Sequence, residues 1–594
     1  MEELCQEYEQ FLSADTDRLS KVREEIRKLA FLRLLTFTGV IAALVFLPAV
    51  SPLLAWGLAI LLLGLFFYSV KCFVKKEKEK EFYTRLIKIN RDERLAMDEV
   101  YEQFDGGAEW INPDHPYSFD LDIFGKGSLF QYVNRTTTPG GKKKLAIRLT
   151  NPLDDREDPG QRQEALLELA GDVRWRQYFS AKGPGGDTKQ QLRFLDEQQA
   201  KPGDPSSLKR LFTVSPLITA SLLLLWSLSV IPWGFMMLPV LGNMLILYLY
   251  RKRINACYQL FGNQTKMLES YLELFRMTEQ QEFKSNLLKT KQQHLVCEGK
   301  HASGVIKELK HIMARFDYRS NIIFAMIGEF VFLWDLICVD QLNKWQKDYH
   351  QEILTWFDAI YEFDALSSLA NLNHNHPDWA LPVYERNEFC FSAGNLGHPL
   401  IKRTKRVGND FRMSGEGKIV ILTGANMAGK STFLRTVGVN MTLAMNGCRV
   451  CATSLTMKPV ALFTNMRVTD NLGKEESYFL AELLRLQQIL TRLRAGIPLF
   501  ILIDEMLKGT NSKDQLTGSK ALIEELIRLR ANGIVATHDL SLTDLAEGYP
   551  SNIINQCFDV RLTGQKLSFD YRLHDGVTHT MNASFLMKKM GLIR

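Results

Sequence analysis

A glycine-rich loop in the last third of the chain has the clearest chemical potential. A β-branched stretch, KIVILT at 418–423, runs directly into the pattern G-x-x-x-x-G-K-S, and an apolar helical stretch follows. Glycines let backbone amides close around phosphate groups, and the start of a helix adds partial positive charge. Lys430 is expected to reach the β- and γ-phosphates of ATP, and Ser431 to bind Mg²⁺. The predicted nucleotide-binding residues are Gly424, Ala425, Asn426, Met427, Ala428, Gly429, Lys430, Ser431 and Thr432.

Two later apolar stretches end in residues that would complete such a site. LFILIDE at 499–505 predicts a buried strand, after which Asp504 can hold Mg²⁺ and Glu505 can orient or deprotonate the attacking water. A solvated turn would also explain two acids in this position. However, IVATHD at 534–539 places His538 after a further strand, where it can sense the γ-phosphate. The predicted cofactors are ATP and Mg²⁺, the metal ligands are Ser431 and Asp504, and the catalytic residues are Glu505, Lys430 and His538.

A serine between these motifs has two interpretations. Ser477 opens a helical stretch, ESYFLAE, that ends at Glu482. A serine in this position commonly caps the helix by accepting a hydrogen bond from a free backbone amide. The alternative is that Ser477 touches the nucleotide of a second subunit.

The surrounding elements divide the chain into several predicted domains. Strands and helices alternate after about residue 381, which is typical of an α/β domain, whereas 160–200 and 255–370 have a helical period with few glycines or prolines. The sequence therefore predicts a multidomain protein with an α-helical core and lever, two transmembrane helical hairpins and a C-terminal α/β P-loop ATPase domain. The predicted ranges are 1–80 for an N-terminal helix and the first hairpin (about 34–70), 81–210 for the core, 211–250 for the second hairpin, 251–380 for the lever and 381–594 for the ATPase domain.

Four uncharged stretches predict the two membrane hairpins. Residues 34–50 and 52–70 form the first pair and 211–231 and 233–250 the second, with proline at each break. Basic residues flank both pairs on their outer sides, which predicts four transmembrane helices with the bulk of the protein in the cytoplasm, in a bacterial inner membrane. The alternative is a pair of buried core hairpins. The first flank contains Arg23, Arg27, Lys28, Arg33, Lys71, Lys75 and Lys76, and the second contains Lys209, Arg210, Arg251, Lys252 and Arg253.

Other features have plain structural interpretations. The apolar stretch 321–339 contains Glu329 and Asp335, whose charges are costly in lipid, so it predicts a buried helix of a soluble domain. NHNHP at 373–377 predicts a polar loop, because its histidines lack partners at metal-ligand spacing. The C-x-x-C of Cys448 and Cys451 predicts packed, reduced thiols. The net charge of +6 suits nucleic acid and membrane equally well and excludes neither.

Together these motifs resemble the MutS family, whose ATPase belongs to the ABC superclass. TGANMAGKST, EESYFLAEL, DEMLKGTNSKD and ATHD resemble its phosphate loop, signature, Walker B and switch-histidine segments, with Tyr478 in place of the usual threonine. Further likeness covers roughly 115–200 and 300–594, including Asn409 and the C-terminal DGVTHTMNASFLMKKMGL. The resemblance implies ATP hydrolysis by a homodimer in which Ser477 and Glu482 form the signature that completes the site of the partner subunit. The family's N-terminal mismatch-reading domain is replaced here by the first hairpin, so mismatch recognition is not expected.

Two functional hypotheses follow from these patterns. In the first, a membrane-tethered ATPase grips double-stranded or branched DNA between its helical arms. In the second, the same machinery is a membrane scaffold that acts on a protein or lipid partner without a DNA role. The lysines that could favour DNA are interleaved with glutamates, so they also fit a solvated helical face; they are Lys284, Lys289, Lys291, Lys300, Lys307 and Lys310. Solute transport ranks lower, because the four uncharged stretches contain no charged path.

Overall fold

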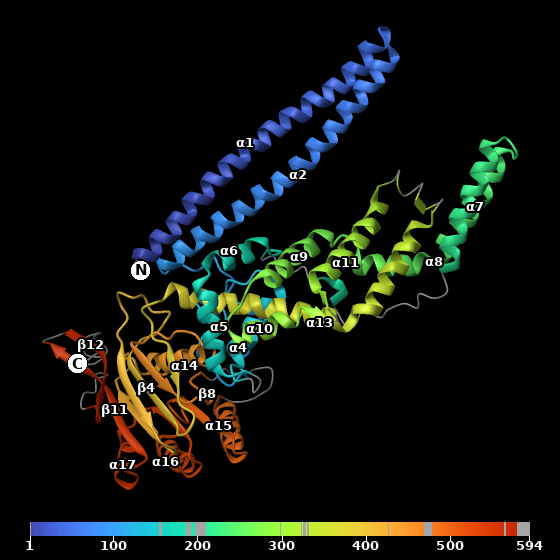
Figure 1. Ribbon diagram of the computed structural model, residues 1–594. Coiled ribbons are helices and arrows are strands. Elements are labelled where there is room, and N and C mark those ends of the chain that lie inside the picture. The colour runs from blue at the N-terminus through green and yellow to red at the C-terminus, as the bar shows by residue number, and fades with distance from the viewer. Residues whose placement is uncertain are drawn as a thin grey trace.

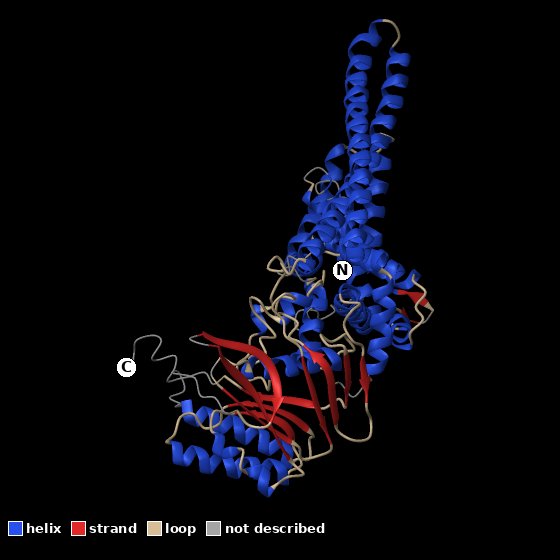
Figure 2. Cartoon of the chain, turned by 90° about the vertical axis from the view of Figure 1, so that its left-hand side faces the viewer, coloured by secondary structure: helices blue, strands red, loops and turns tan. Residues whose placement is uncertain are grey.

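The computed structural model is rich in helices, and its sheets lie in the C-terminal half of the chain (Figure 1). Helical arms project from the body at one end, and the strands gather at the other (Figure 2). The structure describes residues 2–153, 157–185, 192–195, 209–297, 299–321, 324, 328–329, 332–425, 427–467, 478–563 and 566–578.

The longest arm is an antiparallel pair of helices that leaves the body as a rod (Figure 1). Helix α1 (Glu2–Phe46) and helix α2 (Pro52–Met97) are joined by the short 3-10 helix η1 (Leu47–Ala49). Ser51 caps α2 by accepting a hydrogen bond from Leu54 N at 3.5 Å, and Pro52 occupies the first helical position. A proline there loses no hydrogen bond, so the chain reverses where the sequence predicted the break.

Apolar side chains cover the far half of this arm without being buried. Phe46 is 72% exposed, Leu53 is 85% exposed and Leu61 is 69% exposed. Such continuous apolar exposure is unusual for a surface that faces water. The near half is charged and packs on the body, where Tyr8 donates to Asn375 Oδ1 at 2.8 Å and Asn375 donates to Glu93 Oε2 at 3.0 Å.

The second apolar region is shorter than the sequence predicted. Helix α7 (Lys209–Ser227) ends at Ser227, and the chain then turns through Ser229, whose φ is 60°, into η4 (Trp233–Met236) and α8 (Met237–Phe261). Three apolar helices are long enough to span a bilayer, namely Glu2–Ala49, Pro52–Met97 and Trp233–Phe261, and Val214–Ser227 is a shorter apolar helix. Among the described residues, three of the four predicted spanning stretches therefore lie in apolar helices of sufficient length, and the fourth begins in α7.

The helical body is built around one long helix. Helix α13 (Trp334–Asn375) has non-helical dihedrals at Tyr349 and buries Trp356, Phe357 and Phe363 almost completely. Packed with it in the body are helices α3 (Leu129–Val133), α4 (Pro139–Thr150), α5 (Pro159–Gly171), α6 (Val173–Lys182), α9 (Thr265–Gln280), α10 (Asn286–Gln293) and α11 (Ala302–Asp317). Smaller elements are η2 (Ala108–Trp110), η3 (Arg193–Leu195), η5 (Tyr318–Ser320), β1 (Val296–Cys297) and β2 (Lys300–His301).

The histidines of 373–377 belong to packed structure rather than to a polar loop. Helix α13 continues to Asn375, and the His376 ring stacks on Trp379 with ring centroids 4.0 Å apart. The His376 Nε2 atom lies 2.5 Å from Tyr132 Oη, and burial lowers the pKa of His376 to about 3. The loop prediction is wrong because the base of the long arm and the core cover this end of α13. Among the described residues, no group of three or more His, Cys, Asp or Glu side chains could hold a metal ion.

Two other plain interpretations agree with the structure. The described part of 321–339 includes the start of α13, where Asp335 is buried and lies 3.2 Å from Arg319 Nη1. Cys448 and Cys451 are both buried free thiols.

The C-terminal half contains two sheets. The larger has the order β12-β11-β6-β10-β9-β8, and its strands are parallel except for the β11–β12 pair. Its strands are β6 (Ile419–Gly424), β8 (Ala461–Asn465), β9 (Leu499–Asp504), β10 (Asn532–Ala536), β11 (Ile553–Thr563) and β12 (Lys566–Asp575). The smaller has the order β3-β7-β4-β5, with β3 (Pro382–Tyr384), β4 (Cys390–Leu396), β5 (Asn409–Ser414) and β7 (Ser454–Met457).

Helices flank these sheets, as Figure 2 shows. They are α14 (Lys430–Met445), α15 (Tyr478–Arg494), α16 (Ser512–Arg528), η7 (Leu540–Leu542) and α17 (Leu545–Gly548). Helix α14 lies on the side of the body, where Asp122 contacts Arg435 at 3.1 Å and Leu121 packs against Gly438. The first residues of the core are therefore attached to the helix that follows the glycine-rich loop.

Candidate active site at the strand ends

Three adjacent parallel strands bring the predicted site residues to one edge of the sheet. Strand β10 pairs with β6 on one side and with β9 on the other. The carboxyl ends of parallel strands meet at one edge, and ligands of open α/β sheets bind there. Lys430, Asp504, Glu505 and His538 lie at the ends of these strands or just beyond them, with Lys430 at the start of α14.

The glycine-rich loop folds its lysine back over itself. Gly429 is the N-cap of α14 with a φ of 111°, and Gly424 has a φ of 150°. A side chain at Gly424 would meet Phe558 O at 2.8 Å, so only glycine fits there. Lys430 Nζ donates to Gly424 O at 2.7 Å and to Ala425 O at 3.3 Å, and burial lowers its pKa to about 8. The ammonium group therefore lies at the start of α14, partly buried, and donates to two backbone carbonyl oxygens.

A hydroxyl and a carboxylate converge beside this lysine. Ser431 Oγ donates to Asp504 Oδ2 at 2.5 Å. Hydroxyl and carboxylate oxygens are the hard ligands that Mg²⁺ prefers, and Mg²⁺ usually keeps several waters besides one or two protein ligands. The donor set fits the predicted ion.

Glu505 lies in a network with a histidine and a lysine. Its backbone has a φ of 56°, and its carboxylate lies 2.8 Å from His538 Nε2 and 3.3 Å from Lys508 Nζ. The hydrogen bond to His538, reinforced by the charge of Lys508, lowers the pKa of Glu505 to about 2 despite its partial burial. The carboxylate is ionised at neutral pH but is a weak base. It is therefore better suited to orient a water molecule than to remove its proton.

Lys508 is a site residue that the sequence analysis missed. It faces the site because the backbone after β9 turns sharply, with Leu507 at a φ of 57°. Glu482 holds this turn, since its carboxylate accepts hydrogen bonds from Leu507 N at 2.5 Å and Lys508 N at 3.2 Å. Two non-glycine residues with positive φ give no recognisable sequence pattern, so nothing in the chain pointed to this lysine.

Glu482 was predicted as part of a signature that faces a second subunit. In the structure it is 1% exposed and supports the Glu505 turn of its own subunit. Its role toward a partner stays a prediction. Ser477 and Asn426 lie outside the described residues.

A pocket of 1010 Å³ is lined by Lys430, Ser431, Asp504, Glu505, Lys508 and His538 together with further residues. The glycine-rich loop and the acids form one side, and the segment between β4 and β5 forms another together with β12. The walls that the sequence motifs did not include are Ile401, Lys405, Val407, Phe558, Phe569, Asp570 and Tyr571. Asn409, noted in the sequence, ties two walls together by donating to Tyr571 O at 3.0 Å. The pocket thus combines cationic and metal-binding groups with aromatic side chains, and Tyr571 lies beside Gly429 of the glycine-rich loop.

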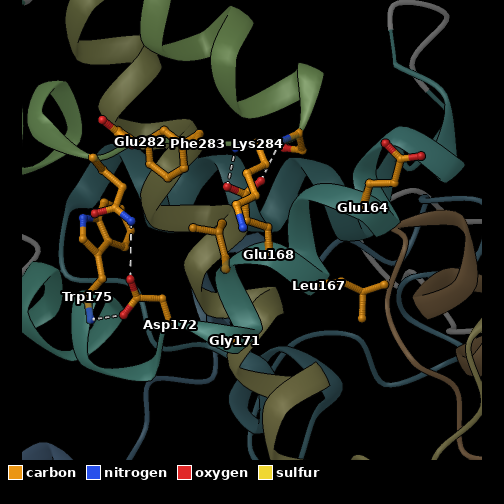
Figure 3. A pocket seen from close by; sticks show the side chains of 12 residues that line it. Glu164, Leu167, Glu168, Gly171, Asp172, Trp175, Glu282, Phe283 and Lys284 are labelled. Atoms are coloured by element: carbon orange, nitrogen blue, oxygen red, sulfur yellow. Dashed lines mark hydrogen bonds between the residues drawn. The ribbon is translucent and has the colours of Figure 1, made fainter.

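A second hollow lies between α5, α6 and residues 281–285 (Figure 3). Two of its acids, Glu168 and Asp172, have structural partners. Glu168 accepts hydrogen bonds from Lys284 N at 2.5 Å and Ser285 N at 2.6 Å, and Asp172 caps α6 by accepting from Trp175 N at 3.0 Å. These carboxylates hold the segment in place, so the hollow is explained by packing.

The chain is similar in sequence to DNA mismatch repair proteins of the MutS type. The family described as MutS domain V matches residues 420–589. The DNA mismatch repair protein MutS of Fervidobacterium nodosum is 27% identical over 82% of this chain and 62% of its own length. MutS of Thermotoga maritima is 33% identical over 38% of this chain and 28% of its own length, and DNA mismatch repair protein MSH4 of Arabidopsis thaliana is 32% identical over 32% and 24%. The chain spans less than two thirds of these relatives.

Proposed function

Because the chain belongs to the MutS family, we propose that it is a membrane-anchored ATPase that uses nucleotide to move its helical body. The observation that carries the proposal is the convergence of Lys430, the Ser431–Asp504 pair and the Glu505–His538 pair at adjacent strand ends. The proposed fold of this part is a P-loop ATPase domain, with ATP and Mg²⁺ as its cofactors.

Each residue of this set has a proposed role in ATP hydrolysis. Lys430 exchanges its backbone partners for the β- and γ-phosphates, and the amides of the glycine-rich loop close around them. Mg²⁺ between Ser431 and Asp504 supplies positive charge beside the same phosphates. Glu505 accepts a hydrogen bond from the attacking water and orients it, while His538 holds Glu505 and faces the γ-phosphate. Lys508 adds positive charge 3.3 Å from the Glu505 carboxylate.

Contacts between the ATPase part and the core connect the proposed nucleotide site to the helical body. Asp122 contacts Arg435 of α14 and also Arg467, at 2.6 Å. Asp120 accepts hydrogen bonds from Thr464 Oγ1 at 2.6 Å and Arg467 N at 2.9 Å. Movement of α14 or of the segment after β8 would therefore displace the start of the core. We propose that the active form is a homodimer in which Ser477 of each subunit contacts the nucleotide of the other.

The long apolar arm supports the membrane part of the proposal. Its exposed apolar half and the basic flanks predicted from sequence fit a hairpin that enters a bilayer and returns. The α7–α8 region would be a second membrane contact, in which Trp233–Phe261 is long enough to span a bilayer and Val214–Ser227 is a shorter apolar helix.

The proposed target of the moving body is DNA, on the printed names of the relatives. A specific observation favours the second candidate, a membrane scaffold that acts on a protein or lipid. Two of the lysines that could face DNA are paired inside the chain, with Lys291 2.8 Å from Glu157 and Lys310 2.9 Å from Glu269. Charge that is already paired contributes little to phosphate binding.

One experiment separates the two candidates. DNA binding by the detergent-purified Glu505→Gln protein is measured with and without ATP over a salt series. Nucleotide-dependent binding with a steep salt slope supports a membrane-tethered DNA clamp. Absent or nucleotide-insensitive binding, together with retained ATP binding, contradicts the DNA role and favours the scaffold.

A further inference from the structure

The segment between β4 and β5 is a wall shared by two cavities. On one side His398, Ile401 and Lys405 line the proposed nucleotide pocket. On the other side Ile401, Lys402, Arg403 and Arg406 line a cavity of 120 Å³ whose opposite wall is the end of α2, including Ala96, Met97 and Glu99. Residues 397–408, hereafter the shared loop, therefore separate the nucleotide pocket from the base of the membrane hairpin.

One hydrogen bond crosses from the hairpin to this loop. Glu99 Oε1 accepts from Arg403 N at 2.6 Å, joining residues 304 positions apart. Because a cavity lies beside this contact, apolar packing between the two segments is incomplete. Arg403 is also held by its side chain, which donates to Asp378 Oδ2 at 3.1 Å, so Glu99 fixes the backbone of the loop and Asp378 fixes the guanidinium.

Glu99 has a left-handed backbone conformation, which is unfavourable for a residue with a side chain. It follows the C-cap of α2 with a φ of 63°, and Val100 N donates to Leu95 O at 3.0 Å, as in a Schellman helix end. Glycine suits this left-handed position best, and any other residue costs free energy there. A glutamate at this position is explained if its side chain is needed for the bond to the shared loop.

The shared loop is stiff enough to transmit a displacement. The Arg406 guanidinium donates to Pro399 O at 3.1 Å and to Ile401 O at 2.8 Å, and it lies over the Trp379 ring at 5.7 Å. A side chain at Gly397 would meet Arg406 Cδ at 2.6 Å, so the loop closes tightly around this arginine. A shift at Arg403 would therefore be carried to His398 and Lys405 in the pocket wall.

We propose that Glu99 is a positioning residue for the nucleotide pocket, through which the membrane hairpin sets nucleotide affinity. The inference rests on the proposed function, because it assigns the pocket to nucleotide. Glu99 touches no nucleotide itself. It holds the loop whose inner face forms the pocket wall, and the Tyr8–Asn375–Glu93 hydrogen bonds fix its helix to the body.

The test compares four variants of the full detergent-purified chain by the Kd of a fluorescent ATP analogue, kcat at saturating ATP, and Tm. Glu99→Ala and Glu99→Gly remove the acceptor and should each weaken binding about fivefold, the loss expected for one hydrogen bond, with kcat unchanged. Glu99→Gln keeps an acceptor oxygen and should stay within about twofold of wild type. Glu102→Ala is the matched control, because it removes an exposed acid from the same turn, 3.8 Å from Lys126 and away from the loop.

The Glu99→Gly variant distinguishes an effect of the side chain on the pocket from an effect on the stability of the fold. Glycine relieves the strained backbone, so its Tm should equal or exceed that of wild type while its ATP affinity falls. Wild-type affinity in both the Ala and Gly variants would overturn the inference, and so would equal weakening in all four variants. If wild type itself binds no nucleotide, the proposed function fails as well, which distinguishes the two outcomes.

The role of the hairpin is tested by moving the protein from detergent into vesicles. The ATP Kd of wild type should change on reconstitution, whereas that of Glu99→Ala should be the same in both. An identical wild-type Kd in detergent and vesicles would overturn the coupling to the hairpin.

Discussion

The sheet and the long arm both contain runs of apolar residues, but these are buried in the sheet and exposed in the arm. Strands β6 and β9 are runs of apolar residues, and Ile421 and Leu502 are 0% exposed. The far half of the α1–α2 arm has a similar composition, yet Leu53 is 85% exposed and Phe46 is 72% exposed. Composition is therefore not what separates a core from a proposed lipid contact.

Length and flanking charge make the difference. Strands β6, β9 and β10 are five to six residues long and lead into polar groups, so they fill a core and present chemistry at its edge. The arm helices are 45 and 46 residues long and bring their apolar halves out together beyond basic flanks. We therefore expect changes at the sheet edge to remove nucleotide chemistry but not membrane association, and changes in the arm to have the opposite effect.

The largest expected effect is at Glu505. Glu505→Gln should lower kcat for ATP hydrolysis about a thousandfold, because the neutral amide no longer orients the attacking water as a carboxylate does. ATP binding and membrane association should be retained. Steady-state hydrolysis and a nucleotide-binding assay measure the two parts, and turnover equal to that of wild type would contradict the assignment.

The next effect is at the lysine of the loop. Lys430→Ala should weaken ATP binding about a hundredfold, since it removes the charge that faces the phosphates. Binding of a fluorescent ATP analogue measures the change. Lys513→Ala, an exposed lysine near the start of α16, serves as a control and should bind normally. Flotation of the Lys430→Ala protein with vesicles should equal that of wild type, because the arm is unchanged.

A charge in the arm should produce the reverse pattern. Ile41→Arg combined with Leu61→Arg places an arginine near the middle of each apolar stretch, at a cost of about 2.5–3.5 kcal/mol each in a bilayer. The protein should leave the membrane fraction but still bind and hydrolyse ATP. Ile41→Ala with Leu61→Ala is the matched control. If the arginine variant stays in the membrane fraction after an alkaline wash, the arm is not a bilayer anchor.

The smallest expected effect is a pH dependence of ATP binding at the sheet edge. Burial lowers the pKa of Lys430 to about 8, so the free site loses this positive charge as the pH rises. ATP association should weaken about tenfold between pH 7 and pH 9, following the fraction of protonated lysine. Flotation should not change over this range. Affinity that stays constant to pH 9 would mean that the lysine remains charged.

Most of the candidate site could be predicted from local sequence. Lys430, Ser431, Asp504 and His538 each follow a strand that an apolar run predicts, and adjacent parallel strands bring them together. Lys508 could not be predicted, because it reaches Glu505 through a turn whose positive φ angles occur at non-glycine residues. The histidines of 373–377 were predicted as loop because their cover comes from residues far away in the chain, such as Tyr132.

The sequence by itself determined the local elements: the strand–loop–helix around Lys430, the acids at a strand end and the uncharged stretches of the arms. These follow from periodicity, glycine positions and hydrophobic length, which act over a few residues. Only the tertiary structure decided that the arm ends against the wall of the pocket, with Glu99 bonded to Arg403. Such a contact depends on how whole elements pack around a common core, and no local pattern in the chain encodes that arrangement.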